Sequence, residues 1–134
     1  MRECIACARI LTRRSQQNYC SSRCMQFERT RLLTEAWLRT GEAQGAFPAG
    51  HFIRDYIARD QRHRCAVCAL PNEWNGARLA FVLDHIDGDA SNNRRENLRL
   101  VCPNCDSQLP TFKSRNKGHG RHWRRLRYAE GKSY

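Results

Sequence analysis

The chain has 134 residues, a net charge of +11 at pH 7 and a sequence pI of about 9.8. This length leaves room for one or two small modules, and apolar burial alone would hold them poorly because the 40% hydrophobic fraction includes eight cysteines. The basic residues are mostly arginine and favour a polyanionic partner, whereas no apolar run or long basic amphipathic helix supports a membrane partner.

The start of the chain does not predict an export signal. Arg2, Glu3 and Cys4 interrupt the region where an apolar segment would be needed. We therefore expect a cytoplasmic protein. In that reducing compartment, paired cysteines bind zinc more often than they form disulfides.

The first predicted element, residues 1–40, is a zinc-binding module. Its four cysteines follow the spacing Cys4-x2-Cys7-x12-Cys20-x3-Cys24, which is typical of a closed tetrahedral zinc site. A disulfide or free thiols are the alternative. Apolar residues at helical spacing predict a short helix over 25–40. Arginines between the cysteine pairs could contact phosphate or simply face solvent, and the module could also bind a protein partner.

A segment rich in helix breakers, 41–50, predicts a linker to a second module, 51–118. This module begins with a predicted helix, in which Phe52, Ile53, Tyr56 and Ile57 recur at helical spacing as far as Asp60. The helix is expected to pack on the second zinc module, which contains a four-cysteine zinc site. The ligands of that site are Cys65, Cys68, Cys102 and Cys105.

Two strands and a helix are predicted between and around these cysteines. The Asn75-Gly76 pair indicates a turn, and the β-branched and aromatic run 79–83 predicts a strand that ends on an acid–histidine pair. A polar Asx-rich loop over 87–93 follows, and residues 98–101 form a second predicted strand. Pro103 suits the first turn of a helix that begins at the last cysteine pair.

Within this module, Asp84-His85-Ile86-Asp87-Gly88 leads through Asn92-Asn93 to Glu96-Asn97-Leu98-Arg99-Leu100 and Cys102-Pro-Asn-Cys105-Asp106. From Ile53 to about Gly118 the chain resembles the HNH nuclease family, above all its small phage-type members. The resemblance implies a small, zinc-stabilised α+β fold with a ββα-metal nuclease domain. It also implies the cytosol of a bacterium or of a phage-infected host.

The resemblance assigns roles to four polar residues. His85 would be the general base, Asn97 would orient it, and Asp84 and Asp106 would hold one catalytic Mg²⁺ or Mn²⁺. Asp106 departs from the family, where His or Asn is usual, and a carboxylate there favours a hard cation. The alternatives are a structural or zinc-binding role for His85, a turn-binding amide at Asn97, and a salt bridge from Asp84 to an arginine.

The resulting hypothesis is a metal-dependent DNA endonuclease with two structural Zn²⁺ ions and one catalytic ion. The basic tail, 119–134, and the residues just before it are expected to bind the DNA backbone. The residues predicted to bind DNA are Lys113, Arg115, Lys117, Arg121, Arg124, Arg125 and Arg127. A non-catalytic zinc DNA-binding or adaptor protein with a decayed metal site, or an RNA-binding or RNA-cleaving protein, is the alternative.

Overall fold

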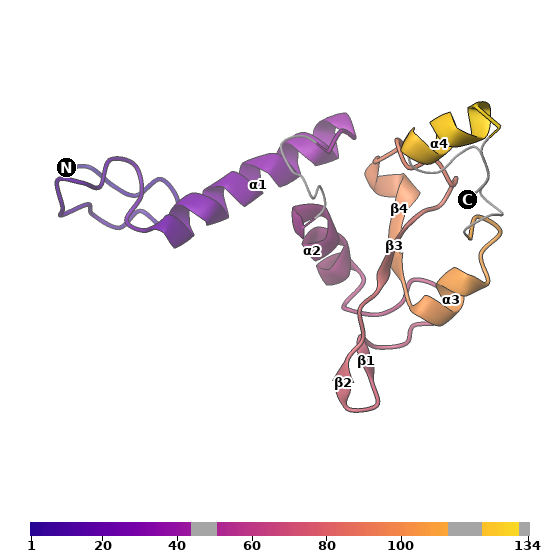
Figure 1. The fold of residues 1–134 in the computed structure, drawn as a ribbon. Helices are drawn as coiled ribbons and strands as arrows, with labels where there is room; N and C mark the ends of the chain where they lie inside the picture. The colour runs from indigo at the N-terminus through magenta and orange to yellow at the C-terminus, as the bar shows by residue number, and fades with distance from the viewer. Residues whose placement is uncertain (44–50, 113–121, 132–134) are drawn as a thin grey trace.

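A computed structural model describes residues 1–43, 51–112 and 122–131. The described part of the chain is a small α+β structure, as predicted (Figure 1). Its elements are α1 (Ser22–Thr40), α2 (His51–Asp60), β1 (Glu73–Trp74), β2 (Ala77–Arg78), β3 (Val82–His85), a 3-10 helix (Arg95–Asn97), β4 (Leu98–Val101), α3 (Pro103–Ser107) and α4 (His122–Ala129). Most of the expected linker and part of the basic tail lie outside the described residues.

Helix α1 connects the N-terminal loops to the rest of the molecule (Figure 1). It begins at Ser22, three residues before the predicted start, because the Ser21 hydroxyl accepts a hydrogen bond from Cys24 N at 3.2 Å and caps the helix. At the other end Gly41 adopts a left-handed conformation, with φ at 73°, and donates its N–H to Trp37 O at 2.7 Å. Both ends of α1 are therefore fixed by local sequence.

The main hydrophobic core joins α1, α2 and β4. Trp37 is fully buried and packs with a buried apolar set from the other two elements: Phe52, Ile53, Ile57, Leu98 and Leu100. Its ring meets that of Phe52 edge-on at 6.4 Å and that of Tyr56 at 5.5 Å between centroids. The end of α1 thus belongs to the same core as the elements that follow the predicted linker.

Strands β3 and β4 form an antiparallel pair in which Val82 lies opposite Val101 and Asp84 lies opposite Arg99. One face of the pair contributes Leu98 and Leu100 to the main core. The other face contributes Val101 to a smaller core around Cys65, Cys102 and Cys105. Because both faces are covered, the register of the pair is strongly specified.

The predicted turn at Asn75 and Gly76 is confirmed, since both residues have positive φ, 53° and 74°, and join β1 to β2. Strand β3 starts at Val82, later than the predicted 79–83, and runs on to His85. The reason is that Leu79 N–H is bound to Asn72 O at 2.9 Å and continues the β1–β2 hairpin. The second predicted strand and the helix that begins at Pro103 are confirmed. Within the described ranges, every helix is too short or too polar to cross a bilayer.

Candidate active site and metal centres

The N-terminal cysteine cluster, Cys4, Cys7, Cys20 and Cys24, brings four sulfur atoms within 4.8 Å of one another. Cys20 Sγ lies 3.6 Å from Cys7 Sγ and 3.5 Å from Cys24 Sγ. These separations are far longer than an S–S bond, and all eight cysteines are free. A tetrahedral zinc with Zn–S bonds of about 2.3 Å needs sulfurs roughly 3.8 Å apart, so the cluster could hold zinc.

The second cysteine cluster, Cys65, Cys68, Cys102 and Cys105, has the same geometry but lies deeper in the protein. Cys68 Sγ and Cys102 Sγ are 3.8 Å apart, and Cys102 N donates to Cys65 Sγ at 3.2 Å. Burial raises the pKa of the Cys65 thiol, but backbone N–H donors, those of Cys68 and Cys102 foremost, bring it down to about 6. Burial raises the pKa of Cys105 to about 12. All four cysteines could be deprotonated in this buried place only if a bound cation neutralised their charge.

The first cysteine pair of each cluster lies in the same backbone turn. Ala8 follows Cys7 with φ at 59°, and Ala69 follows Cys68 with φ at 61°. Each alanine donates its N–H back to the first cysteine of the pair, at 2.8 Å to Cys4 O and 3.0 Å to Cys65 O. A side chain in this left-handed region costs about 1 kcal/mol or more, so both turns are held against their own backbone preference.

Asp84 lies in the middle of β3 and is buried, with 7% of its surface exposed. Its Oδ2 accepts a hydrogen bond from Arg99 Nε at 2.7 Å, across the strand pair. Of the alternatives from the sequence, a salt bridge between Asp84 and an arginine is therefore present. Asp106 lies on α3, which packs against β3, and its N–H is bound to Cys102 O at 2.9 Å.

His85 ends β3, and its Nε2 lies 2.9 Å from Asn93 Oδ1. An amide oxygen only accepts hydrogen bonds, so this contact fits the tautomer in which Nε2 carries the ring proton and Nδ1 has the lone pair. Sequence reasoning did not single out Asn93, which was interpreted as part of an Asx-rich turn. Its membership of the Asn92-Asn93 pair, eight residues after His85, was the available signal.

The buried side chain of Asn97 binds the connection between β3 and β4. Its Oδ1 accepts from Asp87 N at 3.0 Å, and its Nδ2 donates to Asp87 Oδ1 and to Asn92 O, each at 2.9 Å. The side chain of Asn92, foremost, lowers the pKa of Asp87 by donating to its carboxylate. The Asn97 side chain thus contacts the segment that ends at Asn93, and the Asn97 carbonyl accepts a hydrogen bond from Ile86 N, next to His85, at 2.8 Å. Its expected role in orienting His85 stays a prediction, and it could be exerted by either route.

An ion pair links helix α4 to the same connection. Arg125 Nη2 pairs with Asp89 Oδ1, which also accepts hydrogen bonds from the Ser91 hydroxyl at 2.6 Å and from Ser91 N at 3.0 Å. These donors, led by the Ser91 hydroxyl, hold the pKa of Asp89 well below its usual range. Of the residues predicted to bind DNA, Lys113, Arg115, Lys117, Arg121 and the side chain of Arg124 lie outside the described residues.

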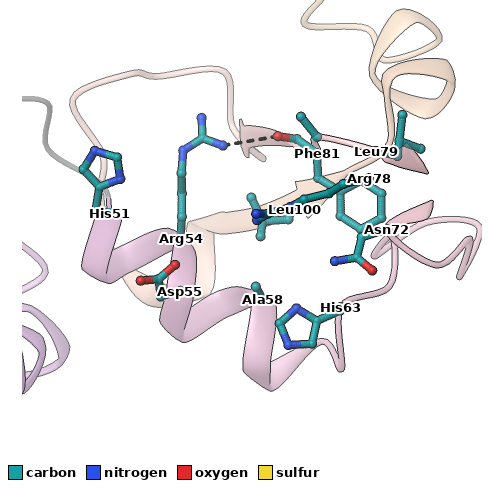
Figure 2. A pocket seen from close by; sticks show the side chains of 11 residues that line it. His51, Arg54, Asp55, Ala58, His63, Asn72, Arg78, Leu79, Phe81 and Leu100 are labelled. Carbon is teal, nitrogen blue, oxygen red and sulfur yellow. Dashed lines mark hydrogen bonds between the residues drawn. The ribbon is translucent and has the colours of Figure 1, made fainter. Parts of the chain in front are cut away.

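A pocket of about 220 Å³ lies between α2 and the residues before β3 (Figure 2). Basic side chains surround it and apolar ones form part of its wall, and Arg54 Nη1 donates to Phe81 O at 3.2 Å. The polar lining consists of His51, Arg54, Asp55, His63, Asn72 and Arg78. The lining includes none of Asp84, His85, Asn97 and Asp106, so the pocket is separate from the candidate active site.

Comparison with known proteins finds similarity in the central segment of the chain. Residues 71–104 match a family model described as HNH endonuclease. A curated relative, the H-N-H endonuclease F-TflIV of Escherichia phage T5, is 39% identical over 56 residues, which are 42% of this chain and 24% of the relative. The chain thus spans about a quarter of that relative's length.

One solved structure, of the rare-cutting HNH restriction endonuclease PacI, is 17% identical and aligns over 99% of this chain and 100% of that chain. Its TM-score of 0.34 is too low to support a conclusion about fold or function.

Proposed function

We propose that the chain is a metal-dependent DNA endonuclease of the HNH family that hydrolyses phosphodiester bonds, and the match of residues 71–104 to the HNH endonuclease model supports this proposal. The observation that carries the proposal is the state of His85. Its Nε2 is engaged by Asn93, at 2.9 Å, which leaves Nδ1 as the basic atom of a ring fixed at the end of β3. A neutral imidazole held in one tautomer is the usual general base near neutral pH.

In the proposed reaction, His85 Nδ1 accepts a proton from the water that attacks the phosphorus. The ring proton on Nε2 stays in the hydrogen bond with Asn93, so the imidazolium that forms is stabilised by an amide oxygen. The neighbouring residue Asp84 points to the opposite face of the strand. Asp84 and His85 therefore both come from β3 but lie on opposite faces, so Asp84 can bind the metal ion while His85 binds the water.

Asp84 and Asp106 are the residues that would hold the catalytic Mg²⁺ or Mn²⁺, from β3 and α3, two elements that pack together. Two carboxylates form a suitable donor set for such a hard cation, and Asp84 is a buried carboxylate that needs a positive charge beside it. When bound, the ion would supply positive charge for the scissile phosphate and the departing oxygen. Arg99 provides the compensating charge in the present structure.

We further propose that both cysteine clusters hold structural Zn²⁺. The second cluster takes two ligands before β3 and two after β4, so its ion would clamp both ends of a ββα-metal domain. Residues 1–40 would form the N-terminal zinc module, 51–118 the nuclease domain and 119–134 a basic tail. The net charge of +11, dominated by arginine, supports DNA as the partner.

The test is a cleavage assay on supercoiled plasmid with a series of divalent ions. We expect nicked or linear product with Mg²⁺ or Mn²⁺ and none with the His85→Ala protein, whose DNA binding should persist. A parallel arm with a structured RNA separates the RNA-cleaving alternative. Absence of cleavage with every ion, together with retained DNA binding, would instead establish the non-catalytic zinc protein. The ion pair between Arg99 and Asp84 favours that alternative, because Asp84 already has a positively charged partner.

A further inference from the structure

We propose that Asn93 is a positioning residue for His85 and that Trp37, from the N-terminal helix α1, holds Asn93 in place. The inference deepens the proposed function and rests on it, because it concerns the proposed general base. Asn93 contacts His85 through its side chain and Trp37 through its backbone. Its side-chain oxygen lies 2.9 Å from His85 Nε2, and its backbone carbonyl accepts a hydrogen bond from Trp37 Nε1 at 2.6 Å.

The donor on the α1 side is rigid. Trp37 is fully buried, and its indole ring is packed edge-on against Phe52 and Tyr56. A large ring in this setting cannot change rotamer without opening a cavity in the main core. The Nε1–H group is therefore a fixed point, and the Asn93 carbonyl that it binds is held at a set place relative to the core.

The C-terminal end of α1 also contacts Arg94, the residue after Asn93. Gly41, which follows α1, lies so close to Arg94 that an added Cβ would be 2.7 Å from Arg94 Cγ. Its φ of 73° is one that side chains rarely adopt, so glycine is required here for two reasons. The C-terminal end of α1 thus contacts two consecutive residues of the β3–β4 connection, Asn93 and Arg94.

From the other side, Asn97 donates to Asn92 O at 2.9 Å and fixes the residue that precedes Asn93. Asn93 is consequently held from both directions by buried polar groups, Trp37 and Asn97. Among the described residues, the Asn93 side chain has one hydrogen-bond partner, the His85 ring, whose tautomer the amide oxygen would select. In this arrangement the N-terminal module, besides any zinc or DNA that it binds, contributes a side chain that orders the proposed active site.

The decisive measurement is the tautomer of His85 in the free protein, read by NMR of ring nitrogens in ¹⁵N-histidine-labelled samples. We expect the Nε2–H form in wild type and in Asn93→Asp, which keeps an acceptor oxygen, and a mixture of forms in Asn93→Ala. Trp37→Phe keeps an aromatic ring but removes the N–H, and it should shift the ring signals toward the same mixture. The exposed Trp74 and Asn18 offer matched controls, Trp74→Phe and Asn18→Ala, that should leave the tautomer unchanged.

In plasmid cleavage, Asn93→Ala should lower kcat by roughly 10-fold to 100-fold with KM nearly unchanged, as for a misplaced catalytic group. Thermal unfolding and zinc content, measured on each variant, exclude loss of fold as the cause. An unchanged tautomer in Asn93→Ala would overturn the positioning role whatever the activity. A wild-type protein that cleaves nothing yet shows a His85 tautomer dependent on Asn93 would overturn the proposed function and leave the positioning contact standing.

Discussion

The ion pair between Asp84 and Arg99 offers a sharp test of the proposed metal site. Asp84 is 7% exposed and the Arg99 side chain 29% exposed, and Nε and Oδ2 are 2.7 Å apart. Removing one partner of a fully buried pair costs about 3–5 kcal/mol, because a buried charge is left alone. Since Arg99 is partly exposed, solvent screens the pair, and we expect Arg99→Met to lower the free energy of unfolding by about 2 kcal/mol.

The assay is urea unfolding of four proteins: wild type, Arg99→Met, Asp84→Asn and the double variant. The buffer must contain no chelator, because chelation would also strip structural zinc. The double-variant cycle should give a coupling free energy of about 1–2 kcal/mol, as for a hydrogen bond to a charged group. If Asp84 is a metal ligand, adding Mg²⁺ should restore stability to Arg99→Met and do nothing for the double variant. Additive effects, with no rescue by Mg²⁺, would refute both the pair and the site.

Four further predictions concern the other site residues, the zinc content and the cysteine turns. His85→Ala should lower the cleavage rate by a factor on the order of 100 or more while leaving DNA binding intact, measured by plasmid nicking beside a gel-shift titration. Asp106→Ala should abolish metal-dependent cleavage, whereas Asp106→His should retain it and extend it to Ni²⁺ or Co²⁺; cleavage that appears only in Asp106→His would mean that the natural site is decayed. Elemental analysis should find about two zinc ions per chain. Ala69→Gly or Ala8→Gly should raise the free energy of unfolding by about 0.5–1 kcal/mol, as measured by thermal unfolding. One zinc or none, or a destabilising Ala69→Gly, would contradict the assigned clusters or turns.

Features that depend on local spacing could be predicted from the sequence. Both cysteine clusters, the Asn75-Gly76 turn and the Pro103 helix start involve residues a few positions apart, or pairs whose spacing matches one ion. Strand β3 was misplaced by a few residues because the apolar run 79–83 does not reveal where the hairpin ends. The hairpin ends where Leu79 N–H binds Asn72 O, and the apolar pattern of the sequence gives no sign of this contact.

The partner of His85 could not be predicted, because the connection after it contains several equivalent amides. Asn92, Asn93 and Asn97 differ in sequence only by position, and the choice among them depends on the path of the loop. That path is fixed by Asn97 and by Trp37, which lies 56 residues from Asn93 in the chain. Trp37 lies within the helix predicted over 25–40, but the partner of its N–H follows only from tertiary packing.

The register of β3 against β4 explains how adjacent residues can take different roles. Val82 and Val101 pair and pack toward the second cysteine cluster, so by alternation Asp84 and Arg99 share that side. Leu83, opposite Leu100, packs toward the main core, and His85 follows it on that side, where α1 reaches Asn93. A slip by one residue would exchange the acid and the base between the two faces. The apolar residues that cover both faces therefore fix which of the two residues meets α3 and which meets Asn93.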